Sequence, residues 1–133
     1  MEQIVKYIGT IHSSLKKLDD CPKLETENAP EASINILPEF VEGIKDIKPG
    51  QELLLFTWLH LADRTTIKCH PRNNRKTPLT GVFSTRSPDR PNPVGIHKVK
   101  VVSISKKGII KVSNLEVVDQ TPLIDIKPAL NYS

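Results

Sequence analysis

The stretch Glu52-Leu53-Leu54-Leu55-Phe56-Thr57-Trp58-Leu59-His60 decides the fold, because it is the most apolar run in the chain. A turn sequence at residues 48–51 precedes it, and a polar segment follows it. A short apolar run between turn signals is typical of a strand that is buried on both faces, with a buried helical segment as the alternative. Its length favours the strand, so we expect a central strand of a β-barrel at residues 52–60.

Six further segments are expected to form strands, because each is short, rich in β-branched or aromatic residues and bounded by turn signals. Their ranges are 4–11, 32–36, 65–70, 96–105, 109–112 and 123–127. Residues 38–44 begin with a proline, which suits the first position of a helix, and they predict one or two helical turns. Repeated short strands separated by turns favour a β-barrel or a β-sandwich.

The side-chain pattern also predicts local detail in two of these segments. The alternation in 96–105 changes face after Val101, which predicts a β-bulge or a strand that turns a barrel corner. In the last segment, Ile124 and Ile126 are expected to share one face, with Leu123 on the other.

Chain length and these elements define the expected architecture. The 133 residues suffice for a sizeable core, so we expect one domain over residues 1–133. The predicted fold class is mainly all-β: a small closed or partly open β-barrel with one short helical segment and long loops. The longest loop is expected at residues 12–31, a polar segment that contains two prolines.

Composition predicts the environment of the protein. Cys21 and Cys69 are far apart and fit no metal-binding motif, and the sequence contains neither a secretory signal nor a membrane-spanning apolar run. We therefore expect a cytoplasmic protein that has no membrane partner. His60 and His70 lack further ligands at a usable spacing, so no metal site is expected.

Basic residues gather in one part of the chain, although the net charge is only +4. They are Arg64, Lys68, Arg72, Arg75, Lys76, Arg86 and Arg90. A concentration of this kind suits contact with the phosphates of a nucleic acid. A solvated loop face is the commoner explanation and remains the alternative.

The stretch from Gly81 to Gly95 reads GVFSTRSPDRPNPVG and contains three prolines. Proline fixes φ and supplies no donor, so a stiff, irregular loop between two strands is expected. Arg86 and Arg90 would project hydrogen-bond donors from a backbone that loses little entropy on binding. A proline-rich connection with solvated arginines is the alternative.

This stretch resembles the signature of the TrmO family, also called TsaA-like, which reads GVF-x-TRSP-x-RPNP-(I/V)-G. Residues 58–64 and 70–72 resemble the family's W-x-H-x-ADR and HPR elements. Residues 119–128 resemble its DGTP-x-x-DIKP element. The resemblance covers nearly the whole chain.

The resemblance implies a tRNA methyltransferase that uses S-adenosyl-L-methionine as its cofactor. Characterised members of the family methylate N6 of threonylcarbamoyl-adenosine beside the anticodon, and they are β-barrel proteins that work as dimers. For this chain, the resemblance therefore implies a homodimer whose partner is tRNA, bound through the anticodon stem-loop.

The resemblance also assigns cofactor contacts. They are Pro22, Lys23, Leu24, His60, Leu61, Arg86, Ile96, Asp119, Gln120, Thr121 and Pro122. Adenine needs an apolar slot, which Leu61, Ile96 and Pro122 would line, and the methionyl carboxylate needs a donor such as Arg86.

Catalytic and substrate-binding roles follow in the same way. The acceptor nitrogen is urea-like and must lose a proton, so an arginine that holds negative charge and a base are both needed. Arg86 is the candidate for the charge, and the candidates for the base are His60, Asp119 and Asp125. The candidates for binding the tRNA phosphates are Arg64, Arg72 and Arg90.

The chain departs from the family pattern at two of the proposed cofactor contacts. The family's Pro-Arg-Gln loop reads Pro22-Lys23-Leu24 here, which removes an amide. The family's DGTP reads Asp119-Gln120-Thr121-Pro122. If the family glycine holds a positive φ, Gln120 carries strain or the turn differs.

Two other functions stay open. The first keeps the cofactor but changes the acceptor, and the second is a non-catalytic β-barrel that binds RNA. Aromatic content is low and most aromatic side chains are expected to be buried, which counts against base stacking and so against the second. The sequence contains no GxGxxG motif, so a Rossmann-type cofactor site is not supported.

Overall fold

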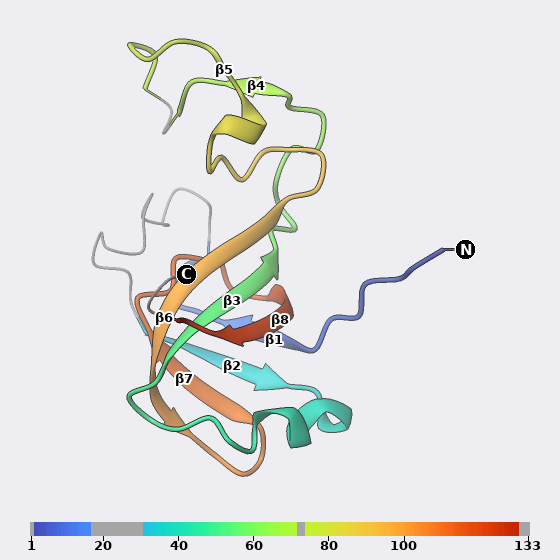
Figure 1. Ribbon diagram of the computed structural model, residues 1–133, viewed down its shortest axis with the longest axis vertical. Helices are drawn as coiled ribbons and strands as arrows, with labels where there is room; N and C mark the ends of the chain where they lie inside the picture. Colours follow the sequence, from blue (N-terminus) through green and yellow to red (C-terminus); the bar gives the residue numbers. More distant parts are fainter. Residues whose placement is uncertain (1, 17–30, 72–73, 131–133) are drawn as a thin grey trace.

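Six antiparallel strands close into a barrel in the order β1-β2-β7-β6-β3-β8 (Figure 1). The structure is a computed structural model, and it describes residues 2–16, 31–71 and 74–130. The strands are β1 Gly9–His12, β2 Ala32–Ile36, β3 Glu52–Trp58, β6 Val94–Ile104, β7 Ile109–Ser113 and β8 Thr121–Pro128. The prediction of a mainly all-β barrel is confirmed, and the barrel is closed.

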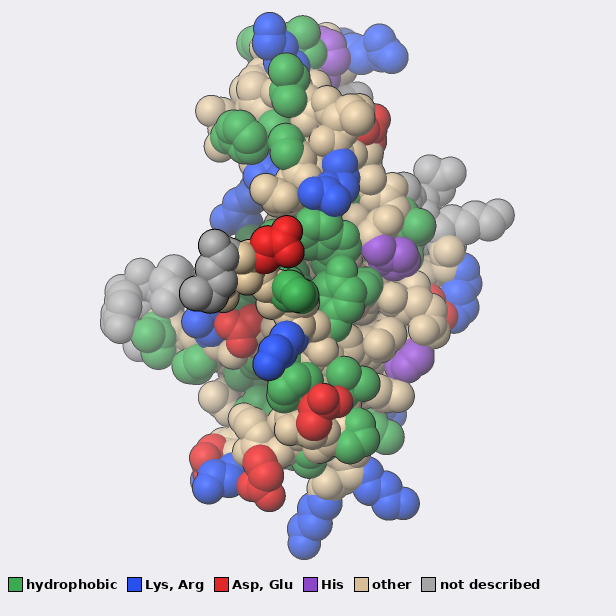
Figure 2. All heavy atoms as spheres, turned by 90° about the vertical axis from the view of Figure 1, so that its right-hand side faces the viewer, with side chains coloured by type: hydrophobic (Ala, Val, Ile, Leu, Met, Phe, Trp, Pro, Cys, Tyr) green, Lys and Arg blue, Asp and Glu red, His purple; other side chains and the backbone are tan. Residues whose placement is uncertain are grey.

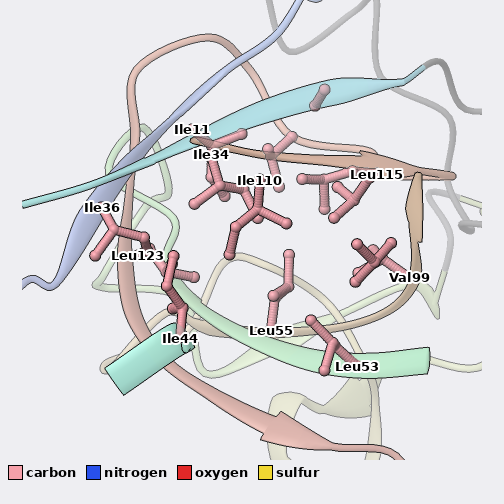
Figure 3. Close-up of a cluster of buried hydrophobic side chains, with 14 residues drawn as sticks. Ile11, Ile34, Ile36, Ile44, Leu53, Leu55, Val99, Ile110, Leu115 and Leu123 are labelled. Carbon is pink, nitrogen blue, oxygen red and sulfur yellow. The ribbon is translucent and has the colours of Figure 1, made fainter. Parts of the chain in front are cut away.

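The core fills the barrel interior, and strand alternation explains which residues reach it. In β3, Leu53 and Leu55 point inward and are fully buried, together with isoleucines from β1, β2 and β7 (Figure 3). The outward residues Leu54 and Phe56 are only half-buried. The strand prediction is therefore confirmed, but burial on both faces was wrong, because a closed barrel has one interior.

A short 3-10 helix, η2 Pro38–Ile44, follows β2 and confirms the predicted helical turn. The proline occupies its first turn, and Ile44 at its end packs into the core (Figure 3). Among the described residues, no helix is long and apolar enough to cross a membrane.

Two strand predictions were wrong in extent. Residues 4–8 are not a strand, because barrel pairing of β1 begins only at Gly9, and Ile4 is 84% exposed. In the segment 65–70, only β4 Lys68–Cys69 is extended, and it pairs with β5 Thr80–Gly81 in a separate two-stranded sheet. β-branched residues alone do not make a strand where no long neighbour is available for pairing.

Two irregularities adjust the strands to the barrel. The predicted bulge in β6 is confirmed, because the pairing with β7 shifts between Val101 and Ser103. A second shift in β8 skips Ile124, so that Leu123 and Ile126 both face inward. The expected pairing of Ile124 with Ile126 on one face was therefore wrong, because an extra residue reverses the alternation.

Residues 59–93, which we call the lobe, rise from one end of the barrel between β3 and β6 (Figure 1). The lobe contains β4, β5 and the 3-10 helix η4 Val82–Ser84, whose Val82 is fully buried. From residue 85 to 93 it has no helix or strand, as the prolines predict.

Candidate functional site

One end of the barrel gathers several of the residues that the sequence assigns to the site. β3 ends where β6 begins, with Trp58 opposite Val94, and β8 begins at Thr121 beside the end of β1. The segments that directly follow β3 and directly precede β8 therefore lie at this end. They contain residues 60–61 and 119–120, and the lobe rises from the same end (Figure 1).

The outer wall below the lobe carries an apolar strip. Ile96 of β6 lies opposite Phe56 of β3, and Phe56 lies opposite Asp125 of β8. Ile96 is 37% exposed and Phe56 is half-buried, so both present apolar surface to solvent. This strip suits a flat apolar ligand group.

Asp119 is held in a network of donors before β8. Its Oδ1 accepts the Ser13 backbone N–H at 2.9 Å, and its Oδ2 lies 2.9 Å from Lys16 Nζ. The Ser13 N–H and the Lys16 ammonium stabilise the carboxylate, so the pKa of Asp119 falls well below its ordinary value of 3.8. A carboxylate with so low a pKa is a poor general base, and its chemistry suits binding a cation or orienting donors.

A polar pocket of about 480 Å³ opens beside this network. Strand register aligns His12 of β1, Ser33 of β2 and Lys111 of β7 in one row across the outer wall, and all three line the pocket together with Asp119. The pocket offers both cationic and anionic groups, which suits a zwitterionic or hydroxyl-bearing ligand group.

Gln120 occupies the left-handed region, with φ of +72°. The glycine of the related motif would adopt this conformation without strain, whereas a glutamine is strained there by about 1 kcal/mol. Its amide nitrogen lies 3.1 Å from His12 Nδ1 and donates to Asp119 Oδ2 at 3.3 Å. The substitution therefore keeps the turn, carries strain and adds a side chain to the Asp119 network.

Arg64 joins the first and last segments of the lobe and lies over Trp58 at the end of β3. Its Nε donates to the Pro91 carbonyl at 2.7 Å, and its guanidinium lies 5.0 Å from the centre of the Trp58 ring. A further link joins the same two segments, because Asp89 accepts the Asp63 backbone N–H at 2.8 Å. These contacts hold the segment after β3 against the proline-rich segment before β6.

Arg90 holds the lobe's own backbone in place. Its Nε donates to the Ser87 carbonyl at 2.7 Å, and its Nη2 donates to the carbonyls of Val82 and Thr85 at 2.7 and 2.5 Å. The predicted phosphate-binding role of Arg90 therefore has to rely on its remaining donors. Three carbonyls held by one side chain make the turn at residues 82–87 rigid.

Arg86 lies in the turn that Arg90 holds, and it is exposed to solvent. It forms no ion pair with another described residue, so its guanidinium is available to an anion. The predicted contacts Pro22, Lys23 and Leu24, and the predicted phosphate ligand Arg72, lie outside the described residues.

The histidines occupy different settings. His60 is exposed at the end of β3, whereas His70 Nδ1 lies 2.9 Å from the Thr77 carbonyl inside the lobe. Across residues 2–16, 31–71 and 74–130, no three His, Cys, Asp or Glu side chains are grouped as metal ligands would be.

Sequence reasoning missed three residues of this region. His12 and Lys16 contact Asp119, which is more than one hundred residues away in the sequence, and no local pattern predicts such a contact. Phe83 is 80% exposed, and no described aromatic side chain is buried, so the expectation of buried aromatics was wrong. The GVF sequence before the TRSP element was the available signal for Phe83.

The fold and the site together define a small antiparallel β-barrel domain with a basic lobe at the end where β3 and β6 meet. A family model described as "tRNA-methyltransferase O N-terminal domain" matches residues 10–133. The chain belongs to this family, which confirms the resemblance to TrmO.

Curated relatives support the assignment. A protein of Methanothermobacter thermautotrophicus, named a probable S-adenosyl-L-methionine-binding protein, is 36% identical over 96% of this chain and 90% of its own length. A protein of Methanocaldococcus jannaschii with the same description is 40% identical over 76% of this chain and 82% of its own length.

Solved structures share the fold. The crystal structure of TrmO from Pseudomonas aeruginosa is 28% identical, with a TM-score of 0.76, and the match covers 99% of this chain and 58% of that one. A second TrmO crystal structure, also 28% identical, has a TM-score of 0.77 over 100% of this chain and 60% of that one. The chain thus spans less than two thirds of these TrmO chains.

Proposed function

We propose that this protein is an S-adenosyl-L-methionine-dependent methyltransferase, and that its acceptor is N6 of threonylcarbamoyl-adenosine beside the tRNA anticodon. Family membership supports the reaction class, and relatives named for S-adenosyl-L-methionine binding support the cofactor. The observation that carries the proposal is the gathering of residues 60–61 and 119–120 at the barrel end from which the basic lobe rises.

The residues at this end fit the proposed cofactor. Ile96 and Phe56 supply an apolar strip for the adenine, and exposed Arg86 supplies donors for the methionyl carboxylate. Asp119 keeps its negative charge at any physiological pH, which suits a ligand with an ammonium or sulfonium group. When bound, the cofactor supplies the electrophilic methyl group.

The protein's own residues then have to prepare the acceptor nitrogen. A base must take its proton, and a cation must stabilise the negative charge that develops. His60 is our choice for the base, because an imidazole nitrogen can accept a proton and this side chain is exposed beside the site. Asp125 is the second choice, and Asp119 is the weakest because of its low pKa.

We further propose that the protein acts on tRNA as a homodimer. The charge of the lobe supports binding to tRNA. The lobe contains seven Lys and Arg residues and two Asp residues, so its net charge is +5, whereas that of the whole chain is +4. Exposed apolar side chains on and beside the outer wall, including Val94 (46%) and Leu61 (51%), support the dimer.

Methyl transfer from labelled S-adenosyl-L-methionine to two tRNA pools tests this proposal. One pool carries threonylcarbamoyl-adenosine and the other lacks it. We expect label in the modified pool alone, and we expect its rate to fall as salt is added. If neither pool is labelled but the protein still binds S-adenosyl-L-methionine, the proposed acceptor is wrong and the proposed cofactor stands. Failure to bind the cofactor would overturn the proposed reaction.

A further inference from the structure

Phe83 is the most exposed aromatic side chain of the described residues, with 80% of its surface open to solvent. It lies in η4 of the lobe, which carries seven Lys and Arg residues. In the upper part of Figure 2, hydrophobic and basic side chains are interleaved over the lobe. Burying this exposed ring against a partner would be favourable, because it would remove apolar surface from water.

The turn that carries Phe83 is built to hold the ring outward. Val82, immediately before it, is fully buried and anchors the turn from within. The Thr85 N–H donates to the Val82 carbonyl at 3.0 Å, and Arg90 donates to the carbonyls of Val82 and Thr85 on either side of Phe83. A ring on so rigid a turn loses little conformational entropy when it binds.

The charge around Phe83 selects the kind of partner. Removing the lobe's net charge of +5 would leave the rest of the chain close to neutral. Both acidic residues of the lobe are engaged by its backbone, because Asp63 accepts the Thr65 N–H at 2.8 Å and Asp89 accepts the Asp63 N–H at 2.8 Å. Arg86, Lys68, Arg75 and Lys76 remain exposed and form no ion pair with a described residue.

We propose that Phe83 stacks on an unpaired base of a single-stranded RNA loop while the surrounding cations contact its phosphates. Aromatic rings interleaved with basic side chains are the usual means of binding unpaired nucleotides. The inference rests on the proposed function, and it adds a specific RNA-contacting residue to it. A second copy of this chain is the competing occupant, since a protein interface also accepts an exposed phenylalanine.

Three substitutions of Phe83 separate these occupants. Phe83→Ala removes the ring, Phe83→Leu keeps apolar bulk but lacks a flat face, and Phe83→Tyr keeps the face. Leu79→Ala is the matched control, because Leu79 is a 59% exposed apolar residue of the same lobe. The exposure of Phe83 means that all three variants should fold, and circular dichroism and thermal melting check this.

The experiment measures binding to a synthetic anticodon stem-loop that carries a fluorescent adenine analogue in the loop. We expect Phe83→Ala and Phe83→Leu to weaken binding about 5- to 100-fold and to lose the quenching of the analogue. Phe83→Tyr and Leu79→Ala should stay within about twofold of wild type. The dissociation constant for S-adenosyl-L-methionine and the sedimentation coefficient should not change in any variant.

Other outcomes overturn the inference in distinct ways. Wild-type RNA affinity in Phe83→Ala would remove the stacking role while leaving the methyl-transfer proposal intact. A dimer that dissociates in Phe83→Ala but persists in Phe83→Leu would assign Phe83 to a self-association surface. If the wild-type protein transfers no methyl group to either tRNA pool and binds no stem-loop, the proposed function and this inference both fail.

Discussion

The barrel and the lobe use apolar side chains in opposite ways. In the barrel, Leu53, Leu55 and Ile110 are at most 1% exposed and share one closed core. In the lobe, Ile67, Leu79 and Phe83 are 59–80% exposed, and the backbone is held by arginine side chains. The barrel therefore supplies folding free energy, whereas hydrogen bonds hold the lobe's backbone and leave its apolar side chains exposed to solvent.

The difference shows why the proposed site lies where the two meet. The strand ends are fixed by the barrel's hydrogen bonds, and the lobe places a rigid, charged surface beside them. A site on a rigid scaffold keeps its geometry, while loops supply varied side chains without disturbing the core. Substitutions in the two regions should accordingly separate stability from activity.

The largest effect is expected in the barrel core. Leu55→Ala should lower the free energy of unfolding by about 2–5 kcal/mol, because it leaves a cavity among fully buried side chains. Leu79→Ala in the lobe should change it by less than about 0.5 kcal/mol. Urea denaturation followed by circular dichroism measures both. Equal losses in the two variants would contradict the division between the regions.

Arg86→Ala should lower the rate of methyl transfer and leave stability nearly unchanged, the opposite of Leu55→Ala. We expect a loss of about 10²–10³ in kcat, if the guanidinium stabilises negative charge during methyl transfer, with little change in stability. Single-turnover methyl transfer at saturating cofactor and tRNA measures the effect, and Arg75→Ala is the control for a general loss of lobe charge. Wild-type turnover in Arg86→Ala would remove its catalytic role.

Arg90→Ala should loosen the lobe without unfolding the barrel. Loss of the bonds to Val82 and Thr85 should lower the local opening free energy by about 1.5–3 kcal/mol. Hydrogen exchange should therefore quicken at residues 82–90 and stay unchanged in β2 and β7. Exchange that quickens equally in the barrel would show that the two regions unfold together.

Asp119→Asn should destabilise the protein by about 1–3 kcal/mol at neutral pH, because charge-assisted bonds become neutral ones. A carboxylate with a lowered folded-state pKa stabilises above its unfolded pKa, and this contribution is lost as the pH falls. The difference between wild type and variant should thus shrink below about pH 3.8, the ordinary pKa of aspartate. Urea titrations across acidic pH measure this, and a constant difference would refute it.

The smallest effect is expected at the strained turn. Gln120→Gly should stabilise the fold by at most about 1 kcal/mol, because glycine adopts a φ of +72° without strain. Asn114, with φ of +62°, provides the control, since asparagine tolerates this region better than glutamine. Thermal melting of Gln120→Gly and Asn114→Gly should show a gain for the first that exceeds the second.

The sequence predicted the barrel better than it predicted the lobe, for a physical reason. The alternating run at residues 32–36 and the apolar run at 52–58 are both strong strand signals, so both strands were found, although the apolar run did not show that only one face of β3 is buried. Pairing partners are not encoded locally, which is why residues 4–8 and most of 65–70 were wrongly assigned as strands. The position of the extra residue in β8, Ile124, likewise depends on pairing with β3, which the local sequence does not encode.

The candidate site was predictable only as far as motifs reach. The TRSP and DGTP elements pointed to Arg86 and Asp119, and the missing glycine of DGTP indicated the positive φ of Gln120. The hydrogen bond from Arg90 to the Val82 carbonyl depends on tertiary geometry. So do the contacts of His12 and Lys16 with Asp119. Neither has a signal in the local sequence.

Hydrogen exchange of the wild-type protein, alone and with S-adenosyl-L-methionine plus modified anticodon stem-loop, tests the central claim most directly. We predict that the ligands protect the lobe and residues 119–122 while β2, β7 and the core keep their exchange rates. Protection confined to β2, β7 or η2, with an unchanged lobe, would contradict the assignment of binding to the lobe and the adjoining strand ends.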